Sequence, residues 1–218
     1  MKVLLIGAGA VGAFYASRIP SDHSVSVVCR SNYDTVKESG FVIKSNNYST
    51  HFMPFAVFSS IDQANQVYDL IIVATKADQF IDISQILHAD TTILLIQNGL
   101  GVEDGYAKRF PNNCILSAVT VISCAQTSPG VITHYSWTRI HIGPFKTNVM
   151  LDIGMQKADL IVNMFKNGGI RDAIVCESEE LQMVRWHKLA INAAFNPTAV
   201  LSDGNYKILC KGTRIRRH

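Results

Sequence analysis

Three polar side chains recur along the otherwise apolar segment 185–197, whose sequence is RWHKLAINAAFNP. Lys188, Asn192 and Asn196 are spaced four residues apart, so on a helix they form one polar stripe. An ammonium group can stabilise and then protonate an oxygen atom that gains negative charge, and fixed amide dipoles can orient a carboxylate or a hydroxyl. Because a buried ammonium or amide without a partner is costly, the stripe either lines a polar binding site or faces solvent.

A second group of residues suited to ligand chemistry stands near the N-terminus, where Gly7, Gly9 and Gly12 have the spacing G-x-G-x-x-G. In this motif the first glycine permits a tight turn, the second lets the backbone approach a pyrophosphate, and the third allows a helix to pack closely on a strand. The free N–H groups of the helix favour phosphate. We therefore predict dinucleotide binding, with a purely structural turn as the alternative. The residues expected to hold the dinucleotide are Gly7, Ala8, Gly9, Ala10, Val11 and Gly12.

The end of the second predicted strand bears on the choice of dinucleotide. Proteins that bind NAD usually place an acidic residue there to contact the ribose hydroxyls. This strand ends in Cys29-Arg30-Ser31-Asn32, which contains no acid. A guanidinium at Arg30 can bind a 2′-phosphate through two hydrogen bonds. We predict NADP rather than NAD, against the alternative of an ordinary surface arginine.

Two further polar residues follow buried strands of the predicted sheet. Lys76 comes after the apolar strand 69–74, and Asn98 comes after the strand 92–96. Because ligands bind outside the carboxyl ends of strands in sheets of this type, we expect Lys76 and Asn98 to face the cofactor and the substrate. Alone, each would more often be an ordinary loop residue.

The order of predicted elements defines the fold class. Strands over 2–6, 24–29, 69–74, 92–96 and 114–122 alternate with helices over 11–19, 35–39, 78–87 and 101–110, and residues 41–58 form one or two further strands. This alternation predicts an α/β fold, an N-terminal Rossmann-type doubly wound parallel sheet, followed by the start of an all-helical C-terminal domain. Paired strands over 131–135 and 139–142, a helix over 153–166, a strand over 174–176 and a helix over 179–201 complete the prediction.

The composition and charge of the chain are those of an ordinary globular protein. The 218 residues are 48% hydrophobic and 17% charged, as in ordinary globular domains. Five basic residues lie in the last fourteen positions, and without them the net charge of +3 becomes −2, so nucleic-acid binding is not expected. The chain has no apolar run of about 18 residues that would span a membrane.

The five scattered cysteines indicate a reducing, cytoplasmic setting. No metal site is predicted, and His134, His141 and His187 are expected at the surface.

Taken together, the motifs KVLLIGAGAVGA, TKADQ, LLIQNGLG, PGVITH…RIHIG and WHKLAINAAFNP resemble the ketopantoate reductase family over residues 1–200. The resemblance implies that NADPH delivers hydride to the ketone of 2-dehydropantoate, a small 2-keto acid, and that pantoate forms for pantothenate and coenzyme A synthesis. It implies that Lys188 is the proton donor and that Asn192 and Asn196 hold the substrate, with Asn98 as a further substrate contact. The cofactor contacts it implies are Gly7 through Gly12, Arg30, Lys76, Asn98 and, more weakly, Ala125.

The resemblance ends near residue 200, whereas the family continues into a helical domain that adds a serine and a glutamate to the site. We expect residues 1–172 to form the NADP-binding Rossmann domain, 173–204 the first helix of a truncated substrate domain, and 205–218 a basic tail. An uncovered apolar face on that helix would favour association, for example as a homodimer. Two alternatives to a ketopantoate reductase stay open, an NADP-binding pseudoenzyme or interaction protein and a reductase of another small 2-keto acid.

Overall fold

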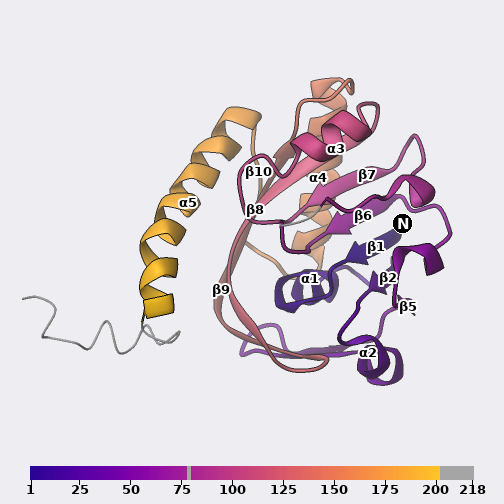
Figure 1. The fold of residues 1–218 in the computed structure, drawn as a ribbon, viewed down its shortest axis with the longest axis vertical. Coiled ribbons are helices and arrows are strands. Elements are labelled where there is room, and N and C mark those ends of the chain that lie inside the picture. The colour runs from indigo at the N-terminus through magenta and orange to yellow at the C-terminus, as the bar shows by residue number, and fades with distance from the viewer. Residues whose placement is uncertain (78–79, 202–218) are drawn as a thin grey trace, which may run out of the picture.

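The computed structural model describes residues 1–77 and 80–201, and in this part of the chain ten strands form one curled sheet. The strand order is β4-β3-β9-β8-β7-β6-β1-β2-β5, with β10 paired to β9 (Figure 1). The central strands run parallel and are buried, namely β1 (Lys2–Ile6), β2 (Ser24–Val28), β6 (Leu70–Val73), β7 (Thr92–Leu95) and the first half of β8 (Cys114–Ser128). The carboxyl ends of β1, β6 and β7 therefore lie at one edge, as predicted.

Apolar side chains from both faces of the sheet form two separate cores. Leu5 of β1 packs with α1 (Ala10–Ala16) and α4 (Leu151–Asn167), whereas the adjacent Leu4 packs on the opposite face with α3 (Asp104–Arg109). Since successive side chains of a strand point to opposite faces, each central strand needs an apolar cover on both sides. The predicted doubly wound α/β arrangement is confirmed.

The edge of the sheet is built by a long antiparallel hairpin. β8 pairs with β9 (Val131–Pro144) over most of its length, and irregularities in register fall between Ile122 and Cys124 and between Gln126 and Ser128. The predicted pair of strands over 131–135 and 139–142 is therefore wrong, because both segments belong to β9 and pair with β8. The outer strands are β3 (Phe41–Lys44), β4 (Thr50–Phe52), β5 (Ala56–Phe58) and β10 (Ala173–Val175), and α2 (Tyr33–Ser39) precedes β3.

Two local predictions are corrected by the structure. The predicted helix 78–87 is replaced over its described part, 80–87, by irregular chain and one 3₁₀ turn (Ser84–Ile86). Asp82 accepts hydrogen bonds from the backbone N–H of Ser84 at 2.9 Å and from its hydroxyl at 2.5 Å, a local pattern that competes with a helix. His134 is 5% exposed and stacks on Phe14 with ring centroids 4.8 Å apart, so it is a core residue and not a surface histidine.

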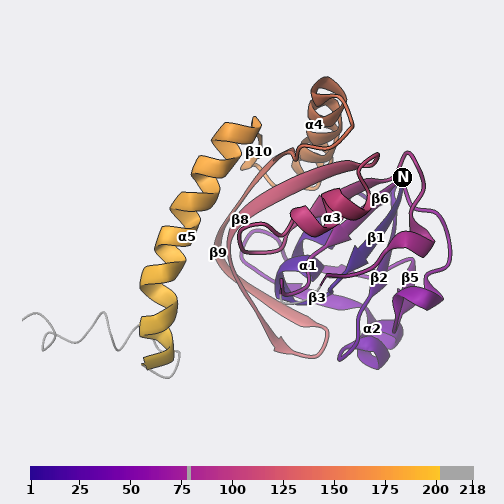
Figure 2. The same ribbon diagram turned by 45° about the horizontal axis from the view of Figure 1, so that its top comes forward.

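The last described element is α5 (Ser178–Leu201), which lies alongside β8 and β9 and outside the body of the sheet (Figures 1 and 2). Only Leu181 and Arg185 of this helix are buried. Leu181 packs with Val119 and Cys176. Farther along, large apolar side chains are exposed, including Met183, Trp186, Ile191, Phe195 and Val200. In the described ranges no helix is long and apolar enough to cross a membrane.

The predicted domain division stays a prediction. β10 begins at residue 173, directly after the boundary placed at 172, and it still pairs with β9 in the main sheet. The predicted basic tail, 205–218, lies outside the described residues.

Candidate functional site

The carboxyl ends of β1, β2 and β6 enclose a cleft of about 660 Å³, which we call the glycine cleft. That volume falls within the roughly 300–1,000 Å³ of typical ligand pockets. The cleft holds the predicted cofactor residues Gly7, Ala8, Gly9, Arg30 and Lys76. Ala10, Val11 and Gly12 continue from the turn into α1 and do not line it.

The three glycines are required for different reasons. Gly7 has φ 95°, and a Cβ atom there would lie 2.6 Å from the backbone nitrogen of Thr75. A Cβ atom on Gly12 would overlap the carbonyl oxygen of Gly7. Around Gly9, by contrast, a Cβ atom would meet no protein atom within 4 Å. The fold itself therefore needs Gly7 and Gly12, whereas a glycine at position 9 leaves bare backbone facing the cleft, which fits the approach of a pyrophosphate.

Two cationic side chains border the glycine cleft. Arg30 and Lys76 are exposed, and within the described ranges neither side chain makes a hydrogen bond or ion pair with the protein. The glycine turn and two cationic side chains therefore border one cleft, and no acidic residue stands at the end of β2.

The wall of the cleft includes a pair of amides that the sequence did not indicate. Asn32 and Gln126 donate to each other's side-chain oxygens at 2.9 and 3.0 Å, so they tie the end of β2 to β8. Both line the glycine cleft. The predicted contact residue Ala125 does not line it, although it is adjacent to Gln126. The amide pair joins positions 94 residues apart, so no local sequence pattern could have revealed it.

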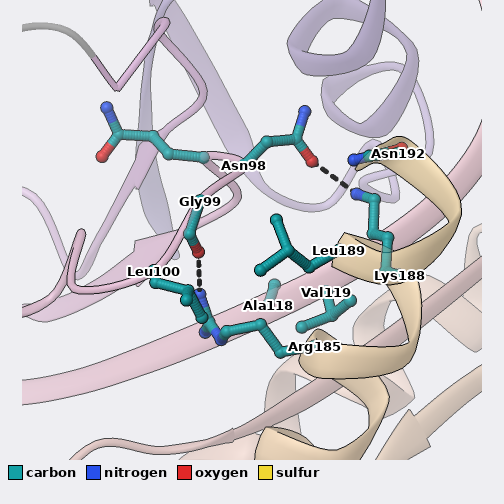
Figure 3. Close-up of a pocket in the computed structure, with 10 residues that line it drawn as sticks. Asn98, Gly99, Leu100, Ala118, Val119, Arg185, Lys188, Leu189 and Asn192 are labelled. Atoms are coloured by element: carbon teal, nitrogen blue, oxygen red, sulfur yellow. Dashed lines mark hydrogen bonds between the residues drawn. The ribbon is translucent and has the colours of Figure 1, made fainter. Parts of the chain in front are cut away.

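A second, smaller hollow contains the predicted catalytic lysine, and we call it the lysine pocket (Figure 3). Lys188 and Asn192 reach it from α5, and Asn98 reaches it from the loop after β7. The ammonium of Lys188 donates a hydrogen bond to the side-chain oxygen of Asn98. Asn196 is exposed and lines neither hollow. The structure therefore brings together three of the four residues predicted to act on the substrate.

The lysine pocket changes the acidity of Lys188. Burial lowers the pKa of this half-buried ammonium from its ordinary 10.5 to about 8, and the positive charge of Arg185 adds to the effect. A lysine with a pKa near neutrality donates a proton more readily than an ordinary lysine.

Gln97 joins the lysine pocket to the glycine cleft. Its side chain lines the lysine pocket, and its amide donates to the Thr75 hydroxyl at 3.0 Å and to the Lys76 carbonyl at 3.2 Å. Thr75 and Lys76 line the glycine cleft. The two hollows are therefore neighbours, and Lys188 lies on the same side of the molecule as the glycine turn.

A buried ion pair beneath the lysine pocket was not predicted. Arg185 of α5 pairs with Glu103, and both groups also bond to the hydroxyl of Ser117 on β8. The charged side chains are only 6% and 2% exposed. Arg185 and Glu103 are 82 positions apart in the sequence, and each looks like a surface residue there.

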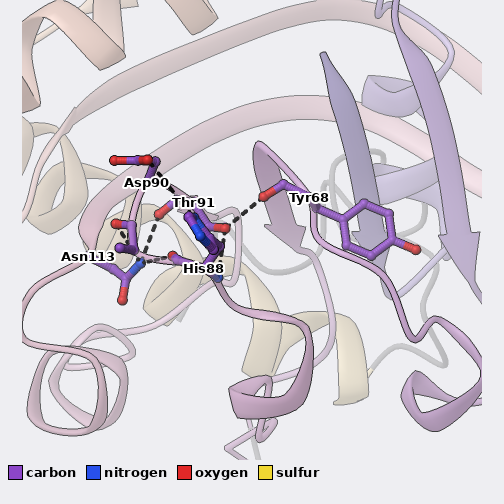
Figure 4. Close-up of polar contacts among 6 residues, drawn as sticks. Tyr68, His88, Asp90, Thr91 and Asn113 are labelled. Carbon is purple, nitrogen blue, oxygen red and sulfur yellow. Dashed lines mark hydrogen bonds and ion pairs between the residues drawn. The ribbon is translucent and has the colours of Figure 1, made fainter.

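Another polar cluster lies at the opposite ends of the strands (Figure 4). The amide of Asn113 donates to the carbonyls of His88 at 2.8 Å and Thr91 at 3.1 Å, and the Thr91 hydroxyl donates to the Tyr68 carbonyl at 2.7 Å. These residues precede β6, β7 and β8 and so stand at amino ends, away from the edge where this fold binds ligands. The cluster braces the turns that lead into the sheet.

The fold and the glycine cleft define a Rossmann-type protein. Residues 3–147 match the family model described as ketopantoate reductase PanE/ApbA, so the chain belongs to the ketopantoate reductase family, as its motifs indicated.

Individual proteins are similar to this chain over most of its length. An uncharacterised protein of Saccharomyces cerevisiae is 31% identical, over 92% of this chain and 64% of that protein. The crystal structure of 2-dehydropantoate 2-reductase from Methylococcus capsulatus has a TM-score of 0.79 at 33% identity, and the match covers 97% of this chain and 68% of that one. A structure of D-mandelate dehydrogenase with NADH and anilino(oxo)acetate has a TM-score of 0.80 at 23% identity, over 98% and 68% of the two chains, which shows a shared fold. The chain spans about two thirds of the length of these relatives.

Proposed function

We propose that the protein catalyses the NADPH-dependent reduction of 2-dehydropantoate to pantoate. The observation that carries the proposal is the ammonium of Lys188, held on Asn98 in a pocket that adjoins the glycine cleft. Membership of the ketopantoate reductase family supports the reaction class. The 2-keto acid would enter the lysine pocket, and the protein would act in the cytoplasm on a small-molecule substrate.

The glycine cleft would hold the cofactor, which supplies the hydride when bound. Bare backbone at Gly7 and Gly9 would accept the pyrophosphate, and Arg30 would bind the 2′-phosphate, with Lys76 as a second cation. The preference for NADP over NAD rests on Arg30 and on the absence of an acid from the end of β2.

Lys188 would stabilise the negative charge that develops on the substrate oxygen and then donate a proton to it. Its pKa of about 8 keeps most of the lysine protonated at pH 7 and still makes it a ready donor. The hydrogen bond to Asn98 fixes the position of the ammonium, and Asn192 lines the same pocket and would orient the substrate. The resemblance to the family also implies a substrate contact for Asn196, which lines neither hollow.

A reductase of another small 2-keto acid is the second candidate. The fold is shared with D-mandelate dehydrogenase, so the fold does not select the acid. Both candidates use the same lysine and the same cleft, and they differ in the side chain that the substrate presents.

Steady-state oxidation of NADPH by the purified chain, with 2-dehydropantoate and with a panel of 2-keto acids of increasing size, separates the candidates. We expect the highest kcat/KM with 2-dehydropantoate and with NADPH rather than NADH. A higher value with another acid would establish the second candidate. Tight NADPH binding without turnover on any acid would refute both and indicate an NADP-binding protein without catalysis.

A further inference from the structure

The buried ion pair joins the two elements that carry the proposed proton donor and its acceptor. Arg185 and Lys188 stand on successive turns of one face of α5. Arg185 donates to the carbonyl of Gly99 at 2.8 Å, and Lys188 donates to the side chain of the preceding residue, Asn98 (Figure 3). Two adjacent residues of the loop are thus held by two successive turns of the helix.

The other end of the Arg185 guanidinium is fixed in the body of the protein. It bonds to Glu103, the residue that precedes α3, and to the hydroxyl of Ser117 on β8. Ser117 in turn donates to Glu103, so the three side chains form a closed network. A planar guanidinium with several donors in a rigid fork can hold such partners in one geometry, which a flexible ammonium cannot.

Burial of the charged groups in this network costs free energy, so stability alone does not explain their presence. A buried ion pair is often no more stable than a well-packed apolar pair of similar volume, because both charges lose their hydration. The packing of α5 could be achieved by apolar contacts such as those of Leu181 with Val119. A guanidinium at position 185 provides, in addition, a fixed anchor for the loop that carries Asn98.

The electrostatic setting of Lys188 also depends on Arg185. Among the residues that line the lysine pocket, Arg185 and Lys188 are the two with charged side chains, and Gln97, Asn98 and Asn192 are neutral. Glu103 lies behind the guanidinium and is paired with it. Burial, and after it the charge of Arg185, lower the pKa of Lys188.

We propose that Arg185, held by Glu103 and Ser117, is a positioning residue that fixes the Asn98 loop against α5 and so sets the place and the charge environment of Lys188. The proposal rests on the proposed function for its catalytic consequence. The effect of Arg185 on the surroundings of Lys188, by contrast, can be measured without turnover of any substrate.

The test compares four forms of the full chain, namely the parent, Arg185→Met, the double variant Arg185→Met/Glu103→Gln, and the control Arg139→Met. The single variant leaves Glu103 buried and unpaired and is expected to melt at a lower temperature. The double variant leaves no buried charge and is expected to melt close to the parent. Arg139 forms a half-exposed ion pair with Asp172 at 2.9 Å, between β9 and the turn before β10, and so controls for loss of an arginine pair elsewhere.

The first measurement is the pH dependence of Lys188 acetylation by acetic anhydride, followed by mass spectrometry of the peptide that contains it. Only the neutral amine reacts, so the midpoint reports the pKa in the folded protein. We expect a midpoint near 8 in the parent and in Arg139→Met, and a higher midpoint in the double variant. The second measurement is steady-state kinetics, in which the double variant should lose about 100-fold in kcat with an unchanged KM for NADPH.

A double variant that melts like the parent and keeps both its Lys188 midpoint and its kcat would overturn the proposal, since Arg185 would then serve the fold alone. A parent that reduces no 2-keto acid would instead refute the proposed function. In that case the acetylation midpoint still decides the role of Arg185, so the two failures are distinguishable.

Discussion

Replacement of Lys188 by methionine is expected to stabilise the fold while it removes the proposed proton donor. Burial is the main cause that lowers the pKa of Lys188 from 10.5 to about 8 in the folded protein. In the unfolded chain the lysine regains its ordinary pKa. Between these two values the unfolded state binds more protons, so stability rises as the pH rises through this window. Below about pH 8 Lys188 is charged in the folded protein, so the folded state is destabilised by the full free-energy cost of the half-buried charge.

The size of the effect follows from the two pKa values. Their difference corresponds to roughly 3 kcal/mol at pH 7. Because Lys188 is half-buried, solvent screening reduces this cost, and loss of the hydrogen bond to Asn98 offsets part of the gain. We expect Lys188→Met to raise the free energy of unfolding by about 1–2 kcal/mol at pH 7.

Urea unfolding at pH 7 and at pH 9.5 measures this effect. The gain of Lys188→Met over the parent should be clear at pH 7 and smaller at pH 9.5, where the parent lysine is neutral when folded. Lys166→Met, at an exposed position of α4, serves as the control and should show no pH-dependent gain. A variant that is less stable than the parent at pH 7, or equally stabilised at both pH values, would show that the half-buried charge of Lys188 does not destabilise the fold.

Four further substitutions test the glycine cleft and the fold. Arg30→Ala should raise the Kd of NADPH by about 10- to 100-fold and leave the Kd of NADH unchanged, as measured by titration calorimetry. An equal rise in the Kd of both cofactors would exclude a contact between Arg30 and the 2′-phosphate. Gly9→Val should weaken NADPH binding by at least about tenfold without lowering the melting temperature, because the valine side chain enters open space in the cleft. Gly7→Ala, by contrast, should lower the free energy of unfolding by about 1–3 kcal/mol. Asn113→Ala should lower the free energy of unfolding, measured in urea, by about 1–3 kcal/mol, because buried carbonyls lose their hydrogen-bond donor. NADPH binding should be unchanged.

Short-range sequence signals were sufficient for the nucleotide-binding half of the fold. β1, the glycine turn and α1 follow one another within the first sixteen residues, so apolar runs and glycine spacing define them locally. α5 was predicted within one residue of its observed start, because its apolar and polar positions repeat with a helical period. Lys188 and Asn192 were predicted as site residues from their helical spacing, and Asn98 from its place after a buried strand. The structure places all three at the lysine pocket, and their roles stay predictions.

One feature that was missed depends on a local turn, and the other two depend on contacts between distant parts of the chain. An Asx-type turn at Asp82 replaces the helix that the local pattern favoured. The continuity of β9 is imposed by its pairing with β8, and no residue of β9 alone specifies it. Arg185 and Glu103 meet only in the folded chain, in which α5 packs against β8 and β9, so no local sequence pattern could have revealed their ion pair.

A single-turnover reaction of NADPH with 2-dehydropantoate, compared between the parent and Lys188→Ala, tests whether Lys188 donates the proton. Lys166→Ala serves as the control. We expect all three forms to bind NADPH with the same affinity. The parent and Lys166→Ala should convert it to NADP⁺ with formation of pantoate, and Lys188→Ala should be slower by about 10²–10⁴-fold. Oxidation of NADPH by Lys188→Ala at the parent rate would show that Lys188 is not the proton donor.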